Sequence, residues 1–127
     1  GLENVWRRHR VLADAVRAAV DAWQAPAGLS FNIVDPQSRS NSVTTVLTGE
    51  IDASELRTIA KSDAGVTLGV GLDEFADRAI RIGHMGHLNP PMILGTLGTI
   101  EAALTKMGSP IGSSGAAAAA AAIGAAL

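Results

Sequence analysis

The chain has 127 residues, which is enough for one domain with its own core but too few for two ordinary domains. Its net charge of −2, with two Trp, two Phe and no Tyr, excludes the basic, aromatic surface that nucleic-acid binding needs. The absence of cysteine excludes disulfides, thiol catalysis and thiolate metal sites. No apolar run approaches the length of a membrane span, and the first ten residues do not form a signal peptide. We therefore expect a cytoplasmic protein without membrane or nucleic-acid partners.

Residues 2–23 have apolar side chains at steps of three and four, with opposite charges such as Arg10 and Asp14 spaced for ion pairs on the other side. This pattern predicts a long helix that ends at the Pro and Gly of residues 25–28. The chain begins inside the pattern, with neither a helix cap nor a Met. We interpret residues 1–24 as a long helix that links to a missing N-terminal domain.

Three segments are predicted to be strands because β-branched and aliphatic residues alternate in them: residues 42–48, 66–70 and 79–83. Residues 31–34 are a candidate for a short fourth strand. Between them, Asp52 and Glu55 form a capping pattern for a helix over residues 52–60. Residues 71–78 are expected to be a loop.

The clearest helix follows the third strand. Asn89 is a good N-cap and Pro90 suits the first helical position, while Gly108 ends the apolar repeat. Gly95 and Gly98 lower the helix propensity, so we expect close packing against a neighbour at these positions.

The order of elements predicts an α+β fold in which helices pack on one face of a small, mainly antiparallel sheet. Residues 25–110 would form this small domain. The tail, residues 111–127, is rich in Gly, Ser and Ala. It is expected to form a short helix that is weakly held, because it has little to bury.

His84 and His87 are three residues apart, a spacing that binds a metal if both lie on a helix. Gly83 and Gly86 instead predict a loop, and no carboxylate lies nearby in the sequence as a third ligand. We therefore assign no metal site and expect the histidines to hydrogen-bond the loop backbone or a partner surface. The serines and carboxylates also lack a catalytic pattern, so no catalytic residue is assigned.

Arg81 lies in the middle of a predicted strand, with an isoleucine on each side. Strand alternation places it on the face that the helices leave open. A guanidinium keeps its charge and matches a carboxylate with two parallel hydrogen bonds. Arg81 is therefore either a carboxylate-binding residue or an ordinary structural or solvated arginine.

The segment AIRIGHMGHLNPPMILGTLGTIEAAL, residues 79–104, resembles the C-terminal region of class V aminotransferases, above all their alanine/serine–glyoxylate and pyridoxamine–pyruvate branch. GLENVWRRHRVLADAVRAAV, residues 1–20, is similar to the helix that leads into the small domain of these enzymes. SNSVTTVLTG, residues 40–49, is similar to the first main strand of that domain.

The resemblance implies the C-terminal domain of a homodimeric pyridoxal-phosphate enzyme, with the active site between a large and a small domain. The large domain would supply the cofactor lysine. The small domain would supply the arginine that holds the substrate carboxylate, at the position of Arg81, and Gly83 and His84 would lie in a possible active-site loop.

The implied reaction moves an amino group between an amino acid of the serine or alanine type and a 2-oxo acid such as glyoxylate or pyruvate. Lys61 and Lys106 lie in predicted helices and do not match the cofactor lysine. This chain alone is therefore expected to be inactive, with no cofactor bound. A stand-alone, non-catalytic binding or oligomerisation module is the alternative.

Overall fold

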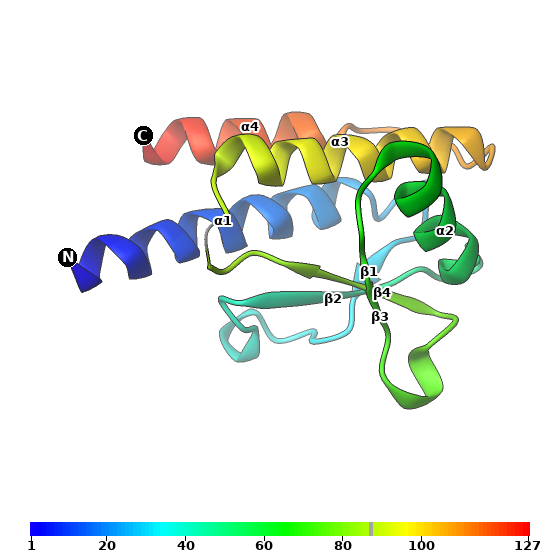
Figure 1. The fold of residues 1–127 in the computed structure, drawn as a ribbon, viewed down its shortest axis with the longest axis horizontal. Coiled ribbons are helices and arrows are strands. Elements are labelled where there is room, and N and C mark those ends of the chain that lie inside the picture. Colours follow the sequence, from blue (N-terminus) through cyan, green and yellow to red (C-terminus); the bar gives the residue numbers. More distant parts are fainter. Residues whose placement is uncertain (87) are drawn as a thin grey trace.

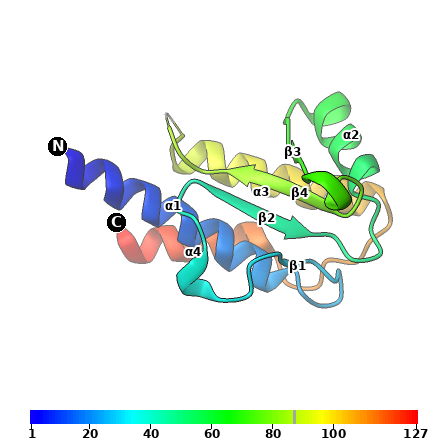
Figure 2. The ribbon, with the colours of Figure 1, turned by 90° about the horizontal axis from the view of Figure 1, so that it is seen from below.

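The computed structural model describes residues 1–86 and 88–127, leaving out the side chain of residue 73. Four strands form one antiparallel sheet in the order β1-β2-β4-β3. Helices α1, α3 and α4 lie together on one face of this sheet, and α2 packs beside α3 near one end (Figures 1 and 2). The predicted α+β fold is confirmed. In chain order the elements are α1 (Leu2–Ala22), β1 (Ser30–Phe31), β2 (Val43–Leu47), α2 (Ala53–Ala64), β3 (Gly69–Val70), β4 (Ala79–Gly83), α3 (Pro90–Lys106) and α4 (Gly115–Ala126), with 3₁₀ turns at Pro36–Ser38 and Asp73–Phe75.

Helix α1 divides into two halves with different surroundings. Its second half buries Leu12, Val16 and Val20 in the core, as the apolar spacing predicts. Its first half leaves Val5 and Trp6 exposed to solvent. Among the described residues, no helix is both long and apolar enough to cross a membrane.

The sheet has one covered and one open face, as the alternation along its strands predicts. Val46 and Ile80 are paired across β2 and β4, and both are buried beneath the helices. On the other side Thr45, Arg81 and Gly69 form a row across β2, β4 and β3. This side, which we call the open face, has only small or polar side chains in that row.

The predicted starts of α2 and α3 are confirmed by their caps. The Asp52 carboxylate accepts hydrogen bonds from the backbone N–H groups of Ser54 and Glu55, at 2.9 and 3.2 Å. The Asn89 side chain accepts one from Met92 N–H at 2.9 Å. Each cap satisfies amide groups that have no partner within the helix, so these helices begin where the sequence predicts.

Two strand predictions are too long. The predicted strand over residues 66–70 is reduced to Gly69–Val70, because Val66 N–H donates to the Ala60 carbonyl and so continues the end of α2. The predicted strand over residues 31–34 is observed as Ser30–Phe31. Beyond it the chain turns away from the sheet, and Val34 is exposed.

The expectation for Gly95 and Gly98 is wrong. A Cβ added at either position would meet no atom within 4 Å other than neighbours in the helix. These glycines lower the helix propensity of α3 without allowing a closer approach to another element.

The expectation of a weakly held tail is also wrong. Helix α4 lies antiparallel to α1 and against α3 (Figure 1), with Ala119 and Ile123 buried. At its end, Arg7 Nη2 donates a 2.9 Å hydrogen bond to the Ala126 carbonyl. A positive charge near the carbonyl end of a helix is favourable, so α1 holds the end of α4 as well as its side.

Glu101 of α3 joins the beginning of α4 to the end of α1. Its carboxylate accepts hydrogen bonds from Trp23 Nε1 at 2.9 Å, from Ser114 Oγ at 3.0 Å and from Ala116 N–H at 3.0 Å. The Trp23 side chain is fully buried. Gly115 lies against the same indole, so closely that a Cβ would come within 2.4 Å of a ring carbon. The three helices therefore meet at one carboxylate.

Candidate functional site

Arg81 is half-buried in β4, on the open face, where strand alternation predicts it. Its Nε donates a 2.8 Å hydrogen bond to the backbone carbonyl of Val70 on β3. In the part of the chain that the structure describes, its two Nη atoms make no hydrogen bond and no ion pair. The guanidinium therefore has two N–H-bearing nitrogens available for an anion.

The neighbours of Arg81 on the open face have small side chains or none. Gly69 is its partner on β3, and Thr45 is its partner on β2. Gly83 follows two residues later on the same side of β4 and is exposed. Two of these three neighbours have no side chain, so a carboxylate or another protein surface can approach the guanidinium from this side.

His84 follows β4 and is fully buried. Its Nδ1 is 3.1 Å from the Asn41 carbonyl and its Nε2 is 2.9 Å from Thr44 Oγ1. Since a carbonyl can only accept, Nδ1 is the donor, and in the neutral ring Nε2 accepts from the threonine hydroxyl. Burial lowers the pKa of His84, the hydrogen bond to Asn41 opposes this shift, and the charges of Arg17 and His9 lower the pKa further.

His84 is thus buried at the end of β4, whereas Gly83 is exposed at the surface. His84 ties the end of β4 to the loop before β2, and its backbone N–H also donates to the Ser42 carbonyl at 2.9 Å. The second histidine of the pair, His87, lies outside the described residues. Among the side chains that the structure describes, which exclude those of residues 73 and 87, no group of three or more His, Cys, Asp or Glu could hold a metal ion.

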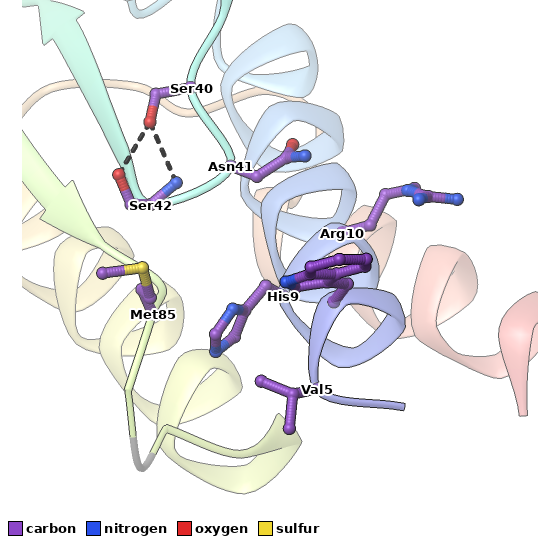
Figure 3. A pocket seen from close by; sticks show the side chains of 8 residues that line it. Val5, His9, Arg10, Ser40, Asn41, Ser42 and Met85 are labelled. Carbon is purple, nitrogen blue, oxygen red and sulfur yellow. Dashed lines mark hydrogen bonds between the residues drawn. The ribbon is translucent and has the colours of Figure 1, made fainter. Parts of the chain in front are cut away.

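A separate groove of about 530 Å³ lies between the first half of α1 and the loops that precede β2 and follow β4 (Figure 3). The His9 ring reaches from α1 toward the segment that carries Met85, and its Nε2 is buried without a partner among the described residues. Arg81 does not line this groove. The groove could not be predicted from the sequence, because three segments that are far apart in the chain build its walls. These are Val5, Trp6, His9 and Arg10; Ser40, Asn41 and Ser42; and Met85.

The two lysines do not fit the role of a cofactor lysine. Lys61 is exposed on α2, and Lys106 is exposed on α3 and paired with the Asp63 carboxylate. Neither lies in an enclosed pocket with a carboxylate that could face a pyridine nitrogen. We therefore assign neither lysine as a cofactor lysine.

Comparison with known proteins gives the relationship of the whole chain. No protein-family profile matches it. The L-aspartate–glyoxylate aminotransferase of Paracoccus denitrificans is 39% identical over 112 residues, which are 87% of this chain and 27% of that protein. The serine–glyoxylate aminotransferase of Methylorubrum extorquens is 39% identical over 109 residues, covering 85% of this chain and 26% of that protein. The chain belongs to this aminotransferase family.

Structural similarity agrees with the sequence similarity. This aminotransferase domain superposes on the crystal structure of the pyridoxamine–pyruvate aminotransferase from Mesorhizobium loti with a TM-score of 0.87 and 34% identity. The match covers 100% of this chain and 32% of that structure. The domain thus spans about a quarter of the length of the curated relatives it matches. The stand-alone module that the sequence left open is not favoured.

Proposed function

We propose that this domain is part of a transaminase that moves an amino group between an amino acid of the serine or alanine type and a 2-oxo acid such as glyoxylate or pyruvate. In this proposal Arg81 binds the α-carboxylate of each substrate. The supporting observation is that Arg81 lies on the open face with both Nη atoms unpaired among the described residues. Gly83 would give the substrate access at the end of the same strand.

The chemistry of Arg81 suits this role. Both substrates of a transamination carry an α-carboxylate, so one cation can orient each of them in turn. A guanidinium remains charged at every physiological pH and forms two parallel hydrogen bonds with a carboxylate. Each hydrogen bond to a charged group contributes about 1.5–3 kcal/mol, so losing the pair has a large kinetic effect.

The rest of the proposed enzyme lies outside this chain. A large N-terminal domain would hold pyridoxal phosphate, which when bound supplies the electron sink of amino-group transfer. The parent protein would be a cytoplasmic homodimer with its active site at the open face. The chain on its own would be inactive and bind no cofactor. An absorbance spectrum of the purified chain after incubation with pyridoxal phosphate tests this, and a stable Schiff-base band would contradict it.

Substitution of Arg81 tests the proposed role directly. In the longer protein that contains this domain, Arg81→Ala should raise KM for both substrates and lower kcat/KM about tenfold or more, because the carboxylate loses its two hydrogen bonds. Arg81→Lys, which keeps the charge but not the fork, should fall between wild type and Arg81→Ala. The matched control is Arg78→Ala, since Arg78 is an exposed arginine just before β4.

The nature of the substrate provides a second control. The loss in Arg81→Ala should be confined to substrates with a carboxylate, so glyoxylate should be affected and glycolaldehyde, an aldehyde without one, should not. Unchanged kinetics with glyoxylate would refute the role of Arg81. An equal loss with both aldehydes would show that the substitution damages the protein generally.

A further inference from the structure

The approach of β3 to β4 is unusually close at Arg81. Gly69 is the residue of β3 that faces Arg81 in the antiparallel register. A Cβ built on Gly69 would lie 2.9 Å from the Arg81 Cβ, 3.2 Å from its carbonyl oxygen and 3.4 Å from its Nε. Cβ atoms of facing residues in antiparallel sheets are ordinarily about 4.5–5.5 Å apart. Only a residue without a side chain therefore fits opposite Arg81 in this position.

This requirement at Gly69 comes from the Cβ and backbone of residue 81, which lie close to β3. The nearest atoms are the stem, backbone and Nε of the arginine, and no other residue is among the three closest. Gly83, on the same side of β4, has no atom within 4 Å of a built Cβ. The atom in closest contact is the Arg81 Cβ, which cannot swing away as the end of a flexible side chain could. A larger residue at position 69 would have to move β3 away from β4.

The close approach fixes the guanidinium through the next residue. Val70 follows Gly69, and its carbonyl accepts the 2.8 Å hydrogen bond from Arg81 Nε. Moving β3 outward moves this acceptor with it. Because Nε is occupied, the side edge of the guanidinium, made of Nε and one Nη, cannot bind a carboxylate with both nitrogens. The end edge, made of the two Nη atoms, remains available.

We propose that Gly69 and the Val70 carbonyl are positioning groups for Arg81, which hold its guanidinium so that a substrate carboxylate binds end-on to the two Nη atoms. The proposal rests on the proposed function, since it assumes that Arg81 binds the substrate carboxylate. Gly69 acts by letting β3 lie close to β4, which keeps the Val70 carbonyl within reach of Arg81 Nε. The Val70 carbonyl acts by fixing the rotation of the guanidinium.

The test is a double-mutant cycle in the longer protein. Gly69→Ala should lower kcat/KM for glyoxylate about tenfold, because the guanidinium loses its fixed orientation. In an Arg81→Ala background the same change should alter kcat/KM by less than about twofold, because the group through which Gly69 acts is gone. Gly95→Ala is the matched control, as the same chemical change at a position with open space around it.

A second measurement does not depend on the folding of any variant. In the isotopically labelled wild-type chain, NMR should detect a hydrogen-bond scalar coupling between Arg81 Nε and the Val70 carbonyl carbon. The coupling should be lost in Gly69→Ala if that variant folds. Absence of the coupling in the wild type would overturn the proposal.

The outcomes separate the two proposals. If Arg81→Ala has normal kinetics, the proposed function fails. If Arg81→Ala is impaired but Gly69→Ala is normal, only the positioning role fails. Equal fractional losses from Gly69→Ala with and without Arg81 would also overturn the positioning role, because they would show a general structural effect.

Discussion

Replacing Glu101 with leucine should weaken the junction of α1, α3 and α4. The substitution leaves the indole N–H of Trp23 buried without the carboxylate that accepts from it at 2.9 Å. An unsatisfied buried donor costs about 1–3 kcal/mol. The first turn of α4 also loses a negative acceptor for Ala116 N–H, which adds about 0.3–1 kcal/mol. The free energy of unfolding should therefore fall by about 1.3–4 kcal/mol.

Thermal unfolding measures this loss. For a chain of this size 1 kcal/mol corresponds to about 4 °C, so Tm should fall by about 5–16 °C. Trp23 fluorescence should report the same transition in a Trp6→Phe background, which removes the only other tryptophan. Glu50→Leu is the control, because it makes the same change at an exposed position. A Tm of Glu101→Leu within about 2 °C of wild type would refute the proposed junction.

The pH dependence of the same site has a definite sign. Burial alone would raise the pKa of Glu101, but hydrogen bonds from Trp23, Ala116 and Ser114 outweigh it and lower the pKa. A carboxylate with a lowered pKa in the folded state stabilises the protein above its unfolded pKa of about 4.3. This stabilisation is lost as the pH falls through the folded pKa. The difference in Tm between wild type and Glu101→Gln should thus be largest near pH 7 and shrink below about pH 4. A constant difference would show that the charge does not contribute.

Two further predictions concern packing and a buried histidine. Gly115→Ala should destabilise the protein by about 1–3 kcal/mol, because the new Cβ would overlap the Trp23 ring. The control, Gly124→Ala on the same helix, has open space around the new Cβ and should be neutral or slightly stabilising. Equal Tm values for the two variants would contradict this prediction. Burial lowers the pKa of His84, so as the pH falls the unfolded state binds this proton before the folded state does. The contribution of neutral His84 to the free energy of unfolding should therefore be fully present above about pH 6.5 and decrease as the pH drops below this value. In a His9→Gln background, His84→Gln should lose less Tm between pH 7.5 and 5.5 than the chain that keeps His84, and equal losses would contradict the buried neutral state.

Features that depend on residues within one helical turn or one strand could be predicted from the sequence. Asp52 and Asn89 cap helices through amide groups two or three residues away, so the local pattern fixes the helix start. The side of the sheet on which Arg81 lies follows from alternation along a single strand. The antiparallel sheet and its helical cover follow in the same way from the order of these elements.

Features that depend on distant segments could not be predicted. The alanine tail has no apolar periodicity, and its attachment depends on Trp23, Arg7 and Glu101, which lie far from it in the sequence. The length of β3 depends on where α2 ends and on how Leu68 turns into the core. In the sequence, nothing distinguishes Gly69 from an ordinary strand glycine. Only the register of β3 against β4 shows that it faces Arg81. The sequence therefore predicted the strand and the face on which Arg81 lies, but not the groups that hold its side chain.

The pairing of α1 with α4 has a consequence for the order of folding. Arg7 and Ala126 are in contact although they are 119 positions apart in the sequence. Helix α4 thus covers part of α1, although most of this domain lies between them in the sequence. Contacts this distant require nearly the whole chain to be present, and closing so long a loop slows folding. Part of the buried stripe of α1 therefore stays in contact with water until α4 has been synthesised, and the docking of α4 is the step that covers it.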